Sequence, residues 1–212
     1  LIPSRGRFEI LKHTLNNLSE VFSENLDDVE VVVKLDTDDI DSHRILDEKF
    51  DIDIKYTISD RLNGYLSLSD FMSECFNLSD SYFVILYNDD ATIKNPHNLI
   101  QNLKGVKDVI SISTERPTSH FPIIHYKIFE ITGGFNKEVV YFDGHYDNVK
   151  FALPKENQFD FNVEFLHHEQ WDLDIYTRKN IESQKYYMHF GERYYVDKDS
   201  NAIRNYFSQQ NS

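Results

Sequence analysis

The chain has 212 residues, a formal net charge of −14 and 40% apolar residues, which is typical of a globular domain and excludes a disordered chain. The acidic balance excludes nucleic acid as a partner, and no apolar run is long enough for a membrane span. The single cysteine, Cys75, excludes a disulfide framework and a Cys-based zinc site, and without a visible signal peptide we expect a cytoplasmic protein.

The first half of the chain alternates predicted strands and helices. Leu1 already reads as the end of a strand, and we expect a few residues of that strand to precede it. Apolar side chains spaced by three and four predict a helix over 8–22, and a β-branched run predicts a strand over 29–35. Further predicted elements are a short helix over 42–50, a strand over 52–59, a helix over 66–78 and a strand over 82–87. This alternation favours a parallel sheet with crossover helices.

The second half is predicted to be more mixed. Its predicted elements begin with a helix over 96–103, strands over 108–114 and 123–131, and a turn over 132–135. A loop over 141–146 then leads into a helix that ends near Pro154, and a strand over 159–166 and a helical, polar segment after Tyr176 follow. The sequence shows no repeat and no linker, so we expect a single domain over residues 1–212.

Polar clusters follow three of the predicted strands. These clusters are Ser4, Arg5 and Arg7; Asp36, Asp38 and Asp39; and Asn88, Asp89 and Asp90. Because the carboxyl ends of parallel strands lie at one edge of a sheet, a single cleft could hold all three, together with Arg61 from the loop after the third strand. We expect Asp38, Asp39 and Asp41 to belong to a solvated loop.

The residue types at this edge suit a nucleoside diphosphate. Arg5, Arg7 and Arg61 carry the donor fork that recognises phosphates or bases, and Asp36 could accept a hydrogen bond from a nucleobase N–H. Side chains alternate along a strand, so Asp89 and Asp90 are expected to point in opposite directions, one to a sugar hydroxyl and one to a metal ion. Asp90 would hold Mn²⁺ or Mg²⁺, which prefer oxygen ligands, and the cation would bridge to the diphosphate.

Four motifs, in this order, resemble the GT-A glycosyltransferases, especially the family-2-like nucleotide-sugar enzymes: Pro3-Ser4-Arg5-Gly6-Arg7, Asp36, Tyr87-Asn88-Asp89-Asp90-Ala91 and Gly133-Gly134-Phe135. The resemblance covers about residues 1–180. It implies the GT-A (Rossmann-like) fold, a mixed, mainly parallel sheet flanked by helices. It also implies a nucleotide-binding part over about 1–105, an acceptor and metal-completing part over about 106–180, and a helical tail. Asn88 replaces the first Asp of the family's Asp-x-Asp motif, so metal binding depends on Asp90.

The resemblance also implies an activity, the metal-dependent transfer of a sugar from a nucleoside-diphosphate sugar, expected to be a UDP-sugar, to a hydroxyl of a carbohydrate acceptor. The donor-binding residues that it implies are Pro3, Ser4, Arg5, Arg7, Asp36, Arg61, Asn88, Asp89 and Gly134. Its late segment implies His168 as a second metal ligand, with His167 in reserve. If the reaction inverts the anomeric centre, a carboxylate must accept the acceptor's proton. Our candidate is Asp147, at the start of the predicted helix, with Asp143 as the fallback.

Other interpretations remain open. Asp147 could simply stabilise a helix N-terminus, and a histidine at a strand end is often a surface or core residue. A sugar-1-phosphate nucleotidyltransferase would share the sheet and the acidic residues, but it usually carries a glycine-rich basic loop after the first strand, where this chain has only Gly6. A non-catalytic glycan-binding domain of the same fold would account for Asn88.

Overall fold

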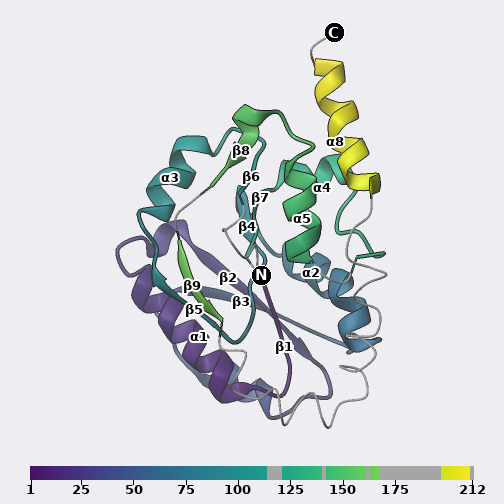
Figure 1. Cartoon of the computed structure of the whole chain (residues 1–212). Helices are drawn as coiled ribbons and strands as arrows, with labels where there is room; N and C mark the ends of the chain where they lie inside the picture. Colours follow the sequence, from purple (N-terminus) through teal and green to yellow (C-terminus); the bar gives the residue numbers. More distant parts are fainter. Residues whose placement is uncertain (114–120, 140–141, 161–162, 168–196, 211–212) are drawn as a thin grey trace.

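The computed structural model describes residues 1–113, 121–139, 142–160, 163–167 and 197–210 (Figure 1). The strands are β1 (Ile2–Ser4), β2 (Glu30–Asp36), β3 (Asp53–Ser59), β4 (Phe83–Ile85), β5 (Ala91–Asn95), β6 (Ile112–Ser113), β7 (Ile123–His125), β8 (Gln158–Phe159) and β9 (Glu164–His167). The α-helices are α1 (Phe8–Val21), α2 (Leu68–Phe76), α3 (Leu99–Val106), α4 (Lys127–Thr132), α5 (Phe142–Lys150) and α8 (Asp197–Gln210). Short 3₁₀ turns are η1 (Leu26–Asp28), η2 (Ser42–Asp47), η3 (Gly64–Ser67) and η4 (Lys155–Asn157).

The sheet is parallel in its first half. β1, β2 and β3 lie side by side in that order, all parallel, with Ile2 opposite Val33. Two backbone bonds join β1 to the end of β4, because the Leu1 N–H group donates to Ile85 at 2.8 Å and Tyr87 donates to Leu1 at 3.0 Å. This bonding pattern is that of parallel neighbours.

The second half of the sheet is mixed. β4 and β6 flank β7 antiparallel, and β6 pairs with β8 in parallel. The strand order is therefore β3-β2-β1-β4-β7-β6-β8, while β5 and β9 form a separate antiparallel pair. The expectation of a mixed, mainly parallel sheet flanked by helices is confirmed.

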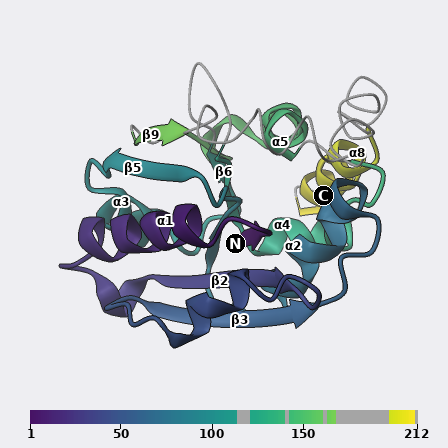
Figure 2. The ribbon, with the colours of Figure 1, turned by 90° about the horizontal axis from the view of Figure 1, so that it is seen from below.

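Helix α1 provides much of the first core. Its residues Leu11, Leu15 and Leu18 are buried, because their spacing places them on one face. This face packs with the apolar strand β2, and α1 lies between the β2–β3 layer and the β5–β9 pair (Figure 2). A second core gathers aromatic side chains around α4 and α5, with Phe129, Phe135 and Tyr146 all buried. No helix within the described ranges has the length and apolar character needed to cross a membrane.

Several sequence predictions for the second half were wrong. The strand expected over 123–131 ends at His125, where α4 takes over, because Ile128 and Phe129 belong to an apolar stripe of helical period. The strand expected over 108–114 is only Ile112–Ser113, and the one expected over 159–166 is split into β8 and β9. Helix α5 begins at Phe142, whereas a loop was expected up to residue 146. Of the segment after Tyr176, residues 197–210 are helical and residues 176–196 lie outside the described residues.

Candidate functional site

Asp36, the last residue of β2, is the centre of a buried charge cluster at the carboxyl edge of the sheet. One of its carboxylate oxygens accepts hydrogen bonds from Arg5 at 2.8 Å and from Arg61 at 3.2 Å, and the other accepts from Lys34. Asp36 is only 3% exposed and Lys34 is fully buried, with the ring of Phe71 centred 3.9 Å from its ammonium nitrogen. The structure therefore confirms that Arg5 and Arg61 lie beside Asp36, and it adds Lys34 as a third cation.

Hydrogen bonds join the loop after β1 to the loop after β2. Arg5 also donates to Asp38, with a second bond of 3.0 Å from Nη2, and the N–H group of Gly6 donates to Asp39 at 2.5 Å. The hydrogen bond to Asp38 raises the pKa of Arg5, and the same bond lowers the pKa of Asp38. Asp38 is 63% exposed, as expected for a solvated loop, but its carboxylate also holds Arg5 in place.

Arg7 defines a second cluster beside the first. Its Nη1 atom lies 2.9 Å from Oδ1 of Asp89 and 3.0 Å from Oδ2 of Asp90. The hydroxyl of Ser4 donates to the other oxygen of Asp89 at 2.7 Å. From inside α1, the Thr14 hydroxyl donates to the carbonyl oxygen of Asp89 at 2.7 Å. The chain after β4 is thus fixed to the end of β1 and to α1.

The expectation that Asp89 and Asp90 point in opposite directions was wrong. Both carboxylates converge on one nitrogen of Arg7. The physical reason is that β4 ends at Ile85 and β5 begins at Ala91, so that Asp89 and Asp90 form a turn between strands. The alternation of side chains along a strand does not apply in a turn.

The two clusters differ in charge. Three cations, Lys34, Arg5 and Arg61, surround the single carboxylate of Asp36, whereas Asp89 and Asp90 outnumber Arg7 by two to one. Burial raises the pKa of Asp89, and the negative charge of Asp90 raises it further, against the opposing effects of Arg7 and Ser4. The charged form of Asp89 is therefore costly in this poorly solvated place, and an added cation would stabilise it.

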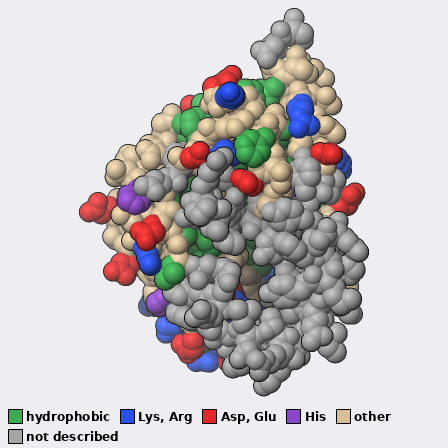
Figure 3. Space-filling view, viewed as in Figure 1, with side chains coloured by type: hydrophobic (Ala, Val, Ile, Leu, Met, Phe, Trp, Pro, Cys, Tyr) green, Lys and Arg blue, Asp and Glu red, His purple; other side chains and the backbone are tan. Residues whose placement is uncertain are grey.

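Because the protein as a whole is acidic, the cations of the two clusters matter for any anionic ligand. On the face of the molecule drawn in space-filling form, acidic and basic side chains are interspersed over the described surface (Figure 3). With a net charge of −14, the surface as a whole repels anions. A phosphate-bearing ligand would thus depend on Arg5, Arg61 and Arg7.

The donor set of the second cluster fits a hard divalent cation, because both carboxylates offer oxygen atoms at one point. Within the described ranges, no group of three His, Cys, Asp or Glu side chains is placed to hold a metal ion. His168, the expected second ligand, lies outside the described residues. The backbone of its neighbour His167, the last residue of β9, pairs with Ala91, the residue after Asp90.

The remaining expected site residues occupy other positions. Pro3 lies on β1 opposite Lys34, and Asn88 is half-buried in the segment between β4 and β5. Gly134 follows the C-cap of α4 with φ at +98°, a conformation that favours glycine, so the expected turn is confirmed. Asp147 is half-buried in the second half of α5, and the expectation that it lies at the helix start was wrong, because α5 begins five residues earlier. Asp143 also lies in α5.

Two contributors to the site, Lys34 and Thr14, were missed at the level of sequence, and Asp38 was expected only as part of a solvated loop. Lys34 interrupts an apolar run of β2, and a lysine there needs a buried anionic partner. Thr14 stands in the apolar stripe of α1 next to Leu15, where a hydroxyl needs a buried acceptor. Both signals were available in the sequence, whereas the bond between Arg5 and Asp38 depends on two loop conformations.

No family model matches the chain, and no curated protein matches its sequence. Solved structures do resemble it. The mannosyltransferase PcManGT from Pyrobaculum calidifontis, in complex with GDP-Man and Mn²⁺, has a TM-score of 0.56 at 14% identity, over 76% of this chain and 55% of that chain. S. aureus TarS has a TM-score of 0.52 at 14% identity, over 71% and 52%. TarS in complex with UDP has a TM-score of 0.52 at 13% identity, over 72% and 53%.

These likenesses concern the fold. The chain spans about half the length of the solved structures that it resembles. At this level of identity the shared feature is the arrangement of strands and helices, and it confirms the expected fold class.

Proposed function

We propose that the chain is a metal-dependent glycosyltransferase that moves a sugar from a nucleoside-diphosphate sugar, a UDP-sugar, to an acceptor hydroxyl with inversion. The observation that carries the proposal is the pair of bonded clusters at the carboxyl ends of β1, β2 and β4. Ligands of open α/β sheets bind at this edge. The fold supports the same assignment, because similar structures contain GDP-Man with Mn²⁺ or UDP.

The first cluster is proposed to bind the nucleoside. Asp36 would accept a hydrogen bond from a base N–H, in a position fixed by Arg5, Lys34 and Arg61, which all donate to it. Asp89 would accept a hydrogen bond from a ribose hydroxyl, in a position fixed by Ser4 and Arg7. Further donor contacts are proposed for Pro3, Asn88 and Gly134. The nucleotide-binding part would cover about residues 1–105.

The second cluster is proposed to hold Mn²⁺ or Mg²⁺ through Asp90 and His168. When bound, the cation would supply Lewis-acid stabilisation of the departing diphosphate. Arg7 now neutralises Asp90 from 3.0 Å. A cation at Asp90 would compete with Arg7 for that carboxylate, and the planar fork of Arg7 also matches phosphate oxygens well. The pairing of His167 with Ala91 supports a place for the β9 end close to Asp90.

The acceptor would be bound by the part of the chain over about residues 106–180, and the helical tail would follow. In the transfer, a bond forms between the acceptor oxygen and the anomeric carbon, and the bond from that carbon to the diphosphate breaks. The acceptor proton passes to a carboxylate, for which we propose Asp147, with Asp143 as the alternative. Asp147 is half-buried, so it has access to solvent and could reach a bound acceptor.

The proposal is tested by calorimetry with UDP and with GDP, each with and without Mn²⁺, followed by a screen of nucleotide sugars for released nucleoside diphosphate. We expect metal-dependent binding of UDP that the Asp90→Ala variant loses. The matched control is Asp41→Ala, which removes a carboxylate that bonds to the exposed Arg44 outside both clusters. Equal absence of UDP binding with and without metal, together with no effect of Asp90→Ala, would reject the proposal.

The two alternative activities give different products. A nucleotidyltransferase would release pyrophosphate from a nucleoside triphosphate and a sugar-1-phosphate. A glycan-binding domain would retain glycans without consuming any donor, whichever divalent cation is present. The same preparation of the chain can be assayed for all three outcomes.

A further inference from the structure

The segment that follows β2, Thr37-Asp38-Asp39-Ile40-Asp41, is an acidic loop that contacts the loop after β1. Asp38 accepts hydrogen bonds from both terminal nitrogens of Arg5, with 3.0 Å between Nη2 and Oδ2. Asp39 accepts a hydrogen bond from the backbone N–H group of Gly6 at 2.5 Å. The acidic loop therefore covers two neighbouring donors of the proposed nucleotide site with carboxylates of its own.

The covered donors are of the kind that recognises phosphate. A guanidinium binds a carboxylate and a phosphate through the same pair of parallel N–H groups. A backbone N–H group beside it, as at Gly6, is a donor typical of anion-binding loops. The carboxylate oxygens of Asp38 and Asp39 thus lie where the oxygen atoms of a phosphoryl group would make the same hydrogen bonds.

Arg5 has two carboxylate partners that differ in burial. Asp36 is buried and accepts from Arg5 at 2.8 Å, whereas Asp38 is exposed. Water and salt weaken an exposed ion pair, so a more highly charged phosphate can displace Asp38. The contact with Asp36 would keep Arg5 oriented after that exchange.

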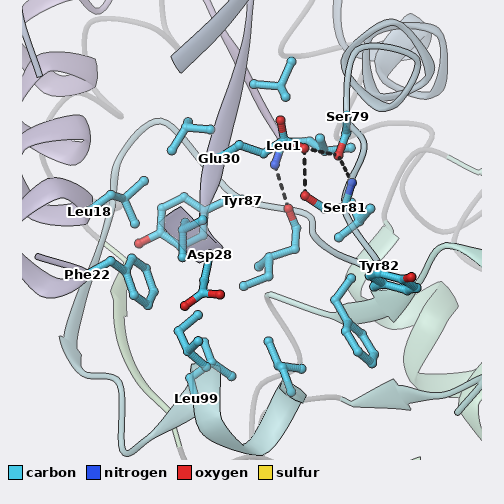
Figure 4. A pocket seen from close by; sticks show the side chains of 18 of the residues that line it. Leu1, Leu18, Phe22, Asp28, Glu30, Ser79, Ser81, Tyr82, Tyr87 and Leu99 are labelled. Atoms are coloured by element: carbon cyan, nitrogen blue, oxygen red, sulfur yellow. Dashed lines mark hydrogen bonds between the residues drawn. The ribbon is translucent and has the colours of Figure 1, made fainter. Parts of the chain in front are cut away.

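A carboxylate that joins elements of the fold has different surroundings. Glu30, at the wall of a cavity at the amino-terminal end of β2, accepts hydrogen bonds from Ser79 at 2.8 Å and from Ser81 at 2.7 Å (Figure 4). Its side chain is 15% exposed, against 63% for Asp38, and its contacts connect β2 to the chain before β4. Asp38 instead bonds to Arg5, a residue that Asp36 already holds.

We propose that the acidic loop is an internal competitor for a phosphoryl group. In the free chain Asp38 and Asp39 occupy Arg5 and the N–H group of Gly6, and both carboxylates leave these donors when the diphosphate of the donor binds. This inference rests on the proposed function, which supplies the diphosphate. Because a carboxylate of the same chain competes at a high effective concentration, the site favours multiply charged ligands over weak anions.

The competition is tested by calorimetry with inorganic pyrophosphate, without metal and at about 0.15 M salt. Asp38→Asn should bind pyrophosphate about fivefold more tightly than the wild type, because an exposed ion pair no longer has to be broken. Asp41→Asn is the matched control. It removes the same charge from the same loop at a similar exposure, but Asp41 bonds to Arg44. Its affinity should change by less than about twofold, since salt weakens interactions between charges that are not in contact.

A double-mutant cycle assigns the gain to Arg5. In an Arg5→Met background Asp38 has no guanidinium to cover, so Asp38→Asn should no longer raise the affinity for pyrophosphate. Because Asp38 is exposed, its replacement by asparagine should leave the chain folded. A gain that persists without Arg5 would overturn the inference.

The same titrations with UDP and Mn²⁺ separate this inference from the proposed function. The inference is overturned if Asp38→Asn binds neither pyrophosphate nor UDP more tightly than the wild type, and metal-dependent binding of UDP to the wild type would then still support the proposed function. Equal gains in Asp38→Asn and Asp41→Asn also overturn it, because general charge repulsion would explain both. If Asp38→Asn alone gains affinity for pyrophosphate and no variant binds UDP, the competition is confirmed and the nucleotide assignment fails.

Discussion

Nη1 of Arg7 lies 3.0 Å from Oδ2 of Asp90, and the same nitrogen also bonds to Asp89. The protein thus places one of its own cations between the two carboxylates to which we assign donor and metal binding. This arrangement keeps two acidic groups close together at little exposure, 7% for Asp89 and 9% for Asp90. It also means that a divalent cation competes with Arg7 for Asp90, so the two should be energetically coupled.

Replacing Arg7 by methionine tests this coupling. The Arg7→Met variant should be less stable by about 2–4 kcal/mol without metal, because it leaves two buried carboxylates without their counter-charge. Millimolar Mn²⁺ should raise its thermal unfolding midpoint by more than it raises that of the wild type. Arg44→Met is the control, since Arg44 bonds to the exposed Asp41 and should alter neither quantity. An equal Mn²⁺ shift in Arg7→Met and wild type would disprove competition at Asp90.

The Asp36 cluster gives a prediction for stability. Asp36→Asn removes the charge on which Arg5, Lys34 and Arg61 converge, and it leaves the fully buried Lys34 ammonium without its carboxylate. We expect a loss of about 3–5 kcal/mol in the free energy of unfolding, measured by urea denaturation. In Asp38→Asn the exposed partner of Arg5 changes, and stability should stay close to that of the wild type. Equal losses in both variants would show that burial of Asp36 is not what matters.

Much of the sheet and of the first cluster could be predicted from the sequence. The β-branched run of β2 ends at a carboxylate, and parallel strands bring their carboxyl ends to one edge, so Arg5, Asp36 and Arg61 were expected to meet. Their bonds confirm this meeting. The reasoning holds because local composition indicates which segments form buried strands. The alternation of strands and helices along the chain indicates that these strands are parallel.

The directions of side chains in turns could not be predicted in this way. Whether Asp89 and Asp90 diverge or converge depends on where β4 stops, and β4 stops three residues before Asn88. Similarly, the apolar run over 123–131 is compatible with a strand and with a helix. The later part of this run forms α4 because Ile128 and Phe129 pack into the second core.

Glu30 gives a prediction for pH dependence. Burial alone would raise its pKa, but hydrogen bonds from Lys55, Ser81, Ser79 and the backbone of Asp80 outweigh it and lower the pKa from 4.5 to about 2. A lowered carboxylate pKa stabilises the fold above the unfolded value of 4.5, and this contribution is lost as the pH falls through about 2.

The Glu30→Gln variant should therefore be less stable than the wild type at neutral pH by about 1–2 kcal/mol, a discounted figure because Glu30 is partly exposed to solvent. The difference should shrink between pH 4.5 and about 2. Urea denaturation of both proteins across this range measures it. Glu156→Gln is the control because Glu156 is exposed, and it should show no such trend. A difference that stays constant down to pH 2 would mean that the Glu30 charge is not responsible.

The last prediction concerns the proposed base. Asp147→Asn should lower turnover by about 10²-fold or more while leaving the affinity for UDP nearly intact, because a general base acts on the acceptor proton in the transition state and not on the donor nucleotide. Steady-state kinetics with the donor and acceptor found in the screen, together with calorimetry, separate the two quantities. Asn148→Asp serves as a matched control, since it changes the charge of the neighbouring exposed residue on α5 and should keep full turnover. If Asp147→Asn keeps wild-type turnover and Asp143→Asn loses it, the role passes to Asp143. If both variants retain turnover, neither carboxylate of α5 accepts the acceptor proton, and the inverting mechanism loses its base on this helix.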